Sequence, residues 1–135
     1  MTRFVVDAAA ALRLASTGSP VPDVHELLAP TLLRSQALST MHEAVHRGEL
    51  TAAEARATLT RLGRLRSRLL GDAVLRNVAW QLADQLGWPS TYSAEYVALT
   101  RLQADYLVTL DAELARAVDG VVPTAPFDAL LDPSA

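Results

Sequence analysis

The chain of 135 residues contains no cysteine and no lysine, and only 5% of its residues are aromatic. The lack of cysteine excludes disulfides and thiolate metal sites and favours an intracellular, cytoplasmic setting. With so few aromatic residues, the core must be built from Ala, Leu and Val, and a hydrophobic content of 50% excludes global disorder. The length suits one domain over residues 1–135, with a core to about residue 122 and a C-terminal tail over 123–135.

Long apolar runs are absent as well. The most apolar stretch near the N-terminus, residues 4–12, is interrupted by Asp7 and is shorter than the about 20 apolar residues of a membrane span. It also lacks a charged leader and a cleavage site, so we expect neither a signal peptide nor a membrane partner. The net charge of −3 argues against a surface covered in nucleic-acid-binding charge, although a local basic patch is compatible with it.

Five arginines lie close together in the sequence. They are Arg56, Arg61, Arg64, Arg66 and Arg68. Such a cluster contacts RNA phosphates, binds an acidic segment of a partner, or forms an ordinary solvated helix face. No aromatic residue interleaves with these arginines, so a base-stacking platform is not indicated there.

Short apolar segments alternate with helix-forming ones along the chain. We predict strands or extended segments over residues 3–6, 69–70, 106–110 and 121–122. We predict helices over residues 8–15, 23–28, 30–47, 52–66, 72–86, 91–103 and 111–118. Buried strands separated by helices indicate an α/β fold with a parallel sheet.

One local pattern occurs twice. Val5-Val6-Asp7-Ala8 and Thr109-Leu110-Asp111-Ala112 each place an Asp where an apolar strand ends and an Ala-rich helix begins. Each Asp alone is a good helix N-cap. The pair favours a shared site, because ligands of open parallel sheets bind beyond the carboxyl ends of the strands. Two carboxylates at one edge repel unless a cation neutralises them, and their hard oxygens suit Mg²⁺ or Mn²⁺.

Four segments resemble the motifs of PIN domains, most closely those of the VapC-type toxins of bacterial toxin–antitoxin systems. They are Phe4–Ala8, Ala29–Gln36, Tyr92–Leu99 and Leu107–Leu114. The resemblance implies a three-layer α/β/α PIN-like domain with a central parallel sheet. It also implies an endoribonuclease in which four acidic residues hold Mg²⁺ or Mn²⁺ and activate water. The implied partners are RNA, a VapB-type antitoxin and a second copy of the chain in a homodimer.

Two of the family's four acidic positions are retained. The first falls on Asp7 and the last on Asp111, with Thr109 as a polar neighbour, whereas Gln36 stands where the family has Glu and Ser93 where it has Asp. Gln offers a carbonyl oxygen and Ser a hydroxyl, but neither supplies the charge that compensates for dehydrating Mg²⁺. Ser93 is also a suitable helix N-cap.

These replacements leave two hypotheses. In the first, Asp7 and Asp111 hold the metal ion, while Gln36 and Ser93 complete the catalytic pocket less effectively and activity is weakened. In the second, the chain is a catalytically inactive PIN domain that binds RNA or a protein. No nearby acid replaces the missing ones, because Glu43 lies two turns from Gln36, about 10 Å along a helix. Glu95 faces a different side of its helix from Ser93.

The predicted helix over residues 30–47 carries two further features. One of its flanks, formed by Gln36, Thr40, Glu43 and Arg47, either lines a cleft beside Asp7 or is solvated. His42-Glu43-Ala-Val-His46 matches H-E-x-x-H, the pattern of zinc proteases. The two histidines fall nearly opposite the apolar stripe of the helix and no third ligand is evident, so we expect them to be exposed and to bind no zinc.

Overall fold

Four parallel strands form one sheet, in the order β3-β2-β1-β4, in the computed structural model, which describes all 135 residues. The strands are β1 (Thr2–Val6), β2 (His25–Pro30), β3 (Ser67–Leu70) and β4 (Tyr106–Val108). The helices are α1 (Ala8–Thr17), α2 (Leu32–His46), α3 (Ala52–Arg64), α4 (Ala73–Leu86), α5 (Tyr92–Gln103), α6 (Ala112–Ala117) and the short 3₁₀-helix η1 (Phe127–Leu131).

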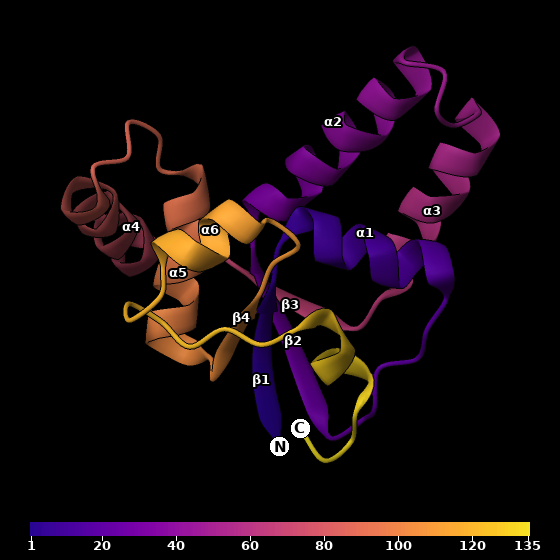
Figure 1. Cartoon of the computed structure of the whole chain (residues 1–135). Helices are drawn as coiled ribbons and strands as arrows, with labels where there is room; N and C mark the ends of the chain where they lie inside the picture. The colour runs from indigo at the N-terminus through magenta and orange to yellow at the C-terminus, as the bar shows by residue number, and fades with distance from the viewer.

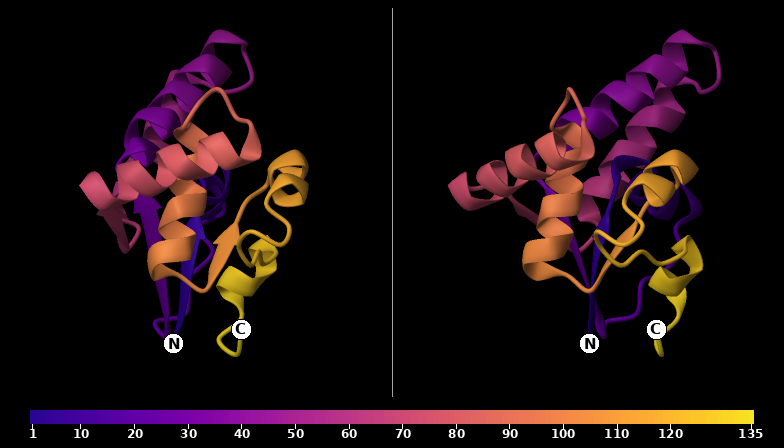
Figure 2. Two further views of the ribbon diagram at one scale, coloured as in Figure 1. Left: turned by 90° about the vertical axis from the view of Figure 1, so that its left-hand side faces the viewer. Right: turned by 60° about the vertical axis from the view of Figure 1, so that its left-hand side comes forward.

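Helices cover both faces of the sheet, as predicted from the sequence (Figure 1). One layer is formed by α1 with α2 and α3, and the other by α5 with α4 packed outside it. Figure 2 shows α2 and α3 rising together from the sheet as an antiparallel pair. The central strands are buried on both sides, since Phe4, Val5 and Val6 of β1 and Leu27 and Leu28 of β2 are at most 2% exposed. None of the helices has the length and hydropathy of a membrane-spanning segment.

The helices begin and end at the capping residues seen in the sequence. Asp7 and Asp72 each accept a backbone N–H bond of 2.8 Å from the first turn of the helix that follows. Thr51 and Glu54 form the predicted capping box at the start of α3. Gly87 ends α4 in the left-handed conformation, with φ at 71°. Six of the seven predicted helices are therefore present, with boundaries within two residues of those predicted.

Two predicted elements are wrong. Residues 23–28, predicted to be helical, contribute instead to strand β2, which pairs with β1 on one side and β3 on the other. A short apolar run has no periodicity that separates a buried strand from a buried helix, so the neighbouring strands decide its conformation. Val121 and Val122 form a turn in place of the predicted strand, because both N–H groups donate to the carbonyl of Val118 at the end of α6. The bridge to β4 forms at Thr124, opposite Leu107.

The segment expected as a tail packs onto the domain. Leu130 is fully buried in the main hydrophobic core, so that core extends past residue 122. The guanidinium of Arg13 lies over the ring of Phe127, at 5.1 Å from its centroid. The hydroxyl of Thr2 donates to the carbonyl of Ala135 at 2.7 Å, which holds the two ends of the chain side by side (Figure 1).

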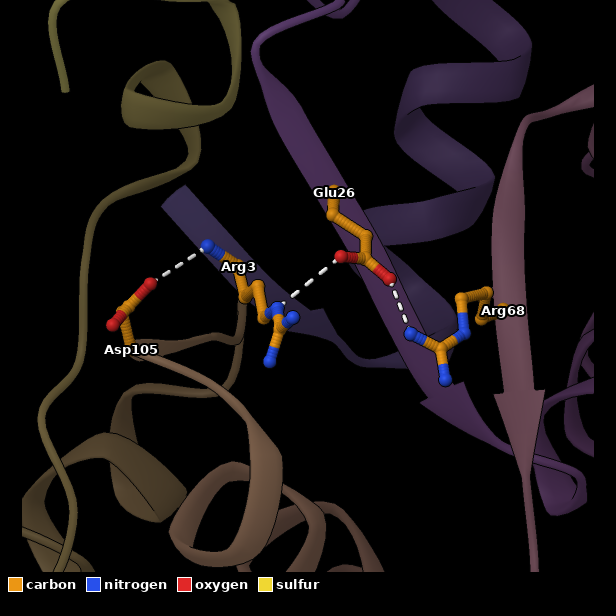
Figure 3. Close-up of polar contacts among 4 residues, drawn as sticks. All are labelled: Arg3, Glu26, Arg68 and Asp105. Atoms are coloured by element: carbon orange, nitrogen blue, oxygen red, sulfur yellow. Dashed lines mark hydrogen bonds and ion pairs between the residues drawn. The ribbon is translucent and has the colours of Figure 1, made fainter. Parts of the chain in front are cut away.

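An ion-pair network joins the strands near their amino ends (Figure 3). The carboxylate of Glu26 on β2 accepts from Arg3 of β1 at 3.2 Å and from Arg68 of β3 at 2.6 Å. The backbone N–H of Arg3 in turn donates to the carboxylate of Asp105 at 2.8 Å, just before β4. This network therefore ties all four strands together at the end of the sheet opposite to Asp7.

Candidate functional site

An open cleft lies beyond the carboxyl ends of β1 and β4, and Asp7 and Asp111 follow these neighbouring strands. The helices connected to these two strands lie on opposite faces of the sheet. Helix α1, which follows β1, covers one face, and α5, which precedes β4, covers the other. Such a switch in direction is where open α/β sheets bind ligands. The cleft has a volume of about 420 Å³. Its polar lining residues are Asp7, Gln36, Ser39, Thr40, Glu43, Ser93, Tyr96 and Asp111.

All four residues singled out from the sequence motifs therefore meet in one cleft. Asp7 is half-buried and caps α1, with Oδ1 accepting from the N–H of Ala10 at 2.8 Å. Its Oδ2 accepts from the hydroxyl of Thr109 at 2.5 Å. The capping role and a place in the cleft are thus compatible in the same side chain.

Asp111 is tied to Asp7 through Thr109. The hydroxyl of Thr109 donates to Asp7 and accepts from the backbone N–H of Asp111 at 3.0 Å. The exposed carboxylate of Asp111 caps α6, with Oδ1 accepting from the N–H groups of Glu113 and Leu114 at 2.9 and 3.2 Å. Because both N–H groups bond to Oδ1 of Asp111, its Oδ2 keeps its lone pairs for another ligand, whereas Oδ2 of Asp7 has already given one of its two lone pairs to Thr109.

Gln36 reaches the cleft from α2 and is held by a tyrosine of α5. The hydroxyl of Tyr96 donates to Oε1 of Gln36 at 2.6 Å. Burial of the phenol raises the pKa of Tyr96, and the nearby carboxylates of Asp7 and Glu95 raise it further, so the hydroxyl stays protonated and remains a donor. The carbonyl oxygen of Gln36 is therefore engaged, and the group left for a ligand in the cleft is its amide NH₂.

Ser93 lies in the first turn of α5 and does not cap it. The helix begins at Tyr92, after Thr91, and the N–H of Tyr92 is bonded to the hydroxyl of Ser90 at 3.3 Å. The capping role considered for Ser93 is therefore wrong, because the N-cap position is Thr91, two residues earlier. Its exposed hydroxyl is left for a ligand of the cleft.

The polar flank of α2 forms one wall of the cleft. Gln36, Thr40 and Glu43 all line it, together with Ser39, whose hydroxyl donates to Glu43 at 3.1 Å. Arg47, grouped with this flank from the sequence, instead pairs with Glu49 outside the cleft. Of the two acids weighed as replacements, Glu95 does not line the cleft; burial raises its pKa and the charge of Arg76 partly offsets this.

Tyr96 is the site residue that the sequence analysis missed. It is 3% exposed and would be classified as core from its burial alone. A signal was available, because Ser93 and Tyr96 are three residues apart and residues at that spacing share a helix face. A polar tip on an otherwise apolar residue needs a partner when it is buried, and Gln36 is that partner.

The histidines and arginines singled out earlier lie away from the cleft. His42 and His46 are exposed, as predicted. Three arginines of the sequence cluster are engaged by other parts of the chain. Arg61 donates to the carbonyl of Ala15 at 2.7 Å, and Arg66 and Arg68 form ion pairs with Asp23 and Glu26. None of the five clustered arginines lines the cleft.

The carboxylates of the cleft are of the kind that Mg²⁺ takes as ligands. No three Asp, Glu, His or Cys side chains in the chain are grouped so as to hold a metal by themselves. Asp7 and Asp111 supply two carboxylates, and Mg²⁺ is commonly bound by one or two carboxylates together with the phosphates of a substrate. The amide of Gln36 and the hydroxyl of Ser93 are donors suited to phosphate oxygens.

The fold matches solved structures, although no protein-family model and no curated protein sequence matches the chain. PAE2754 from Pyrobaculum aerophilum aligns with a TM-score of 0.71 and 22% identity, over 96% of this chain and 94% of that one. VapBC-1 from nontypeable Haemophilus influenzae aligns with a TM-score of 0.59 and 10% identity, over 93% of this chain and 98% of that one. These alignments confirm the PIN-like α/β/α fold that the sequence motifs implied.

Proposed function

We propose that the chain is a cytoplasmic, VapC-like endoribonuclease that depends on a divalent metal ion and has weakened activity. The observation that carries this proposal is the joining of Asp7 and Asp111 through the hydroxyl of Thr109 in the cleft between β1 and β4. The structural likeness to VapBC-1 supports the same class of protein.

Each residue of the cleft has a distinct part in this proposal. Asp7 and Asp111 would hold Mg²⁺ or Mn²⁺, which when bound polarises a phosphoryl oxygen and lowers the pKa of water. Thr109 fixes the carboxylate of Asp7 by its short hydrogen bond. The amide of Gln36 and the hydroxyl of Ser93 donate to non-bridging phosphate oxygens and so orient the scissile phosphodiester.

The weakness of the site follows from its charge. Four carboxylates at the family's motif positions become two here, and the oxygen of Gln36 is already engaged by Tyr96. Glu43 also lines the cleft, but from the wall formed by α2, where it accepts from Ser39. Less negative charge compensates less well for the dehydration of Mg²⁺, so Asp7 and Asp111 would hold the ion tightly only where an RNA phosphate completes its ligands. We therefore expect slow cleavage and weak metal binding in the absence of RNA.

The test compares two Asp→Asn variants of equal charge. Asp7→Asn removes the cleft carboxylate but keeps a residue that caps helices well. Asp72→Asn makes the same change at the N-cap of α4, outside the cleft. With a single-stranded RNA and Mn²⁺, we expect slow cleavage by the native and Asp72→Asn proteins and none by Asp7→Asn or in EDTA. Cleavage that persists in Asp7→Asn contradicts the proposal, and RNA binding without cleavage supports the inactive binding domain instead.

We further propose a VapB-type antitoxin and a second copy of the chain as protein partners. A hollow of about 420 Å³ between α2, α3 and β3 supports an apolar docking segment. Its apolar lining residues are Leu33, Leu38, Leu59, Leu62, Leu65 and Leu69. Co-purification with the product of a neighbouring antitoxin-like reading frame tests the first partner. Light scattering of the isolated chain tests the second, with the mass of a dimer expected.

A further inference from the structure

A second hollow opens beside the acidic cleft. Its volume is about 340 Å³, and it shares Ser93, Asp111 and Leu114 with the cleft. The two hollows therefore adjoin at these three side chains. The remaining lining residues of the second hollow are Trp88, Pro89, Ser90, Glu113 and Ala117. We call it the Trp88 hollow.

The lining of the Trp88 hollow combines an apolar wall with a polar rim. Trp88, Pro89 and Leu114 supply apolar surface, while Ser90 and Glu113 supply hydrogen-bonding groups. No basic side chain lines the hollow, and Asp7, which with Asp111 would hold a metal ion for a phosphate, lines only the cleft. A flat, uncharged ring with polar edges matches this chemistry, and an unpaired nucleobase is such a group.

The backbone of Trp88 is held firmly. Gly87 ends α4 in the left-handed conformation, and the N–H of Trp88 donates to the carbonyl of Ala83 at 2.8 Å. Pro89 follows and restricts the chain on the other side. The half-buried Trp88 also packs against the hydrophobic core. Little conformational entropy is lost when a ligand stacks on a side chain that is already positioned in this way.

We propose that the Trp88 hollow binds one unpaired nucleobase of a single-stranded RNA, stacked on the indole of Trp88. The polar edge of the base bonds to Ser90 and Glu113. The neighbouring phosphate of the same strand then lies in the acidic cleft, where Ser93 and Asp111 belong to both hollows. The inference rests on the proposed function, because it takes RNA to be the ligand of the cleft.

The first test uses the two tryptophans of the chain. Trp80 is 66% exposed on α4 and lines neither hollow, so Trp80→Phe leaves Trp88 as the only indole fluorophore. A short single-stranded RNA of mixed sequence, with Ca²⁺ in place of Mg²⁺ to limit turnover, is expected to quench that fluorescence saturably. In the matched Trp88→Phe protein, the remaining fluorescence of Trp80 is expected to stay unchanged. Quenching of Trp80 with none at Trp88 overturns the proposal.

The second test measures affinity. Stacking of one base on an aromatic side chain corresponds to a change of about 5- to 150-fold in the dissociation constant. We expect Trp88→Leu to weaken RNA binding within this range, Trp88→Phe to keep most of it, and Trp80→Leu to leave it unchanged. Thermal melts check that each variant is folded. Native-like affinity in a folded Trp88→Leu protein overturns the proposal, as does a native protein that binds no RNA.

A scan with abasic RNAs identifies the nucleotide whose base occupies the Trp88 hollow. A single abasic site moved along the RNA is expected to lower affinity for the native protein at one position and to have no effect there in Trp88→Leu. A free mononucleotide is expected to quench the fluorescence of Trp88 only at far higher concentration than the RNA strand does. Equal potency would assign the hollow to a free nucleotide and contradict the proposal.

The outcomes for the subsite and for the nuclease can be told apart. Quenching without RNA cleavage by the native protein refutes the nuclease but not the subsite. Cleavage by the native protein, with unchanged RNA binding in Trp88→Leu, refutes the subsite alone.

Discussion

Tyr96 on α5 donates its hydroxyl proton to the side-chain oxygen of Gln36 on α2, at 2.6 Å. This bond joins helices from opposite layers of the fold across the end of the sheet, beside Asp7. It also sets which end of the amide faces the cleft. The residue that replaces a carboxylate of the family motif therefore has its oxygen occupied by Tyr96, which leaves its amide NH₂ for a ligand of the cleft.

Restoring the two missing acids is expected to strengthen metal binding. Gln36→Glu with Ser93→Asp adds two carboxylates to the cleft, so mutual repulsion lowers stability without metal, and Mn²⁺ offsets this by binding the folded state. Thermal melts should show a larger rise with Mn²⁺ than in the native protein, and RNA cleavage should be faster. Gln81→Glu with Gln85→Glu, at two exposed positions of α4, is the charge control. An equal Mn²⁺-dependent rise in melting temperature in that control, or no such rise in the double variant, would refute the interpretation that the site has lost metal affinity with its two acids.

Removing the hydroxyl of Tyr96 tests the bond to Gln36. Tyr96→Phe is expected to lower the free energy of unfolding by about 1 kcal/mol, because the carbonyl of Gln36 loses its donor. It should also change RNA affinity, since the freed amide can then turn either end toward the cleft. Tyr92→Phe removes an exposed hydroxyl from the same helix and serves as the control in urea unfolding. Identical curves for the two variants would show that the bond contributes nothing.

Thr109 is expected to act as a positioning residue for both aspartates. Thr109→Val keeps the shape of the side chain but removes the donor to Asp7 and the acceptor for the N–H of Asp111. We expect a loss of about 1–3 kcal/mol in stability, together with a weaker response to Mn²⁺. Thr109→Ser should restore the Mn²⁺ response, because it keeps the hydroxyl. Thr60→Val, at an exposed position of α3, should change stability by less than about 0.5 kcal/mol.

The network around Glu26 predicts a pH dependence of stability. Hydrogen bonding to Arg68 and the charges of Arg68 and Arg3 hold the pKa of Glu26 below its ordinary value of 4.5. Because the pKa is lower in the folded than in the unfolded chain, the stabilisation is fully present above pH 4.5 and is lost as the pH falls through the folded pKa. Glu26→Gln should lower stability at pH 7 by about 1 kcal/mol, with a smaller effect in acid. Asp119→Asn, at an exposed carboxylate outside the network, should lack this pH-dependent difference.

The C-terminal segment is expected to contribute to global stability. Leu130→Ala empties a fully buried position and should cost about 2–5 kcal/mol in denaturant unfolding. Leu102→Ala removes the same atoms from a side chain that is 41% exposed and should cost clearly less. Equal losses would mean that η1 detaches from the domain in solution.

Local sequence determined the α/β pattern, most helix boundaries and the two aspartates at strand ends. Asp7, Asp72 and the Thr51–Glu54 capping box act over three or four residues, so their effect is readable from neighbouring positions. The retained motifs around Asp7 and Asp111 likewise indicated one shared edge of the sheet, because parallel strands end on the same side.

Only the tertiary structure decided the features that depend on partners far along the chain. Residues 25–30 form a strand because β1 and β3 lie on either side of them, although the run itself suits a helix equally well. The amide of Gln36 is oriented by Tyr96, which lies 60 residues away. Trp88, which follows α4, and Asp111, which follows β4, line the same hollow beside the cleft. The physical reason is the same in each case. Conformational propensity acts within a turn or two of the backbone, whereas burial and hydrogen bonding depend on which distant groups the fold brings next to a residue.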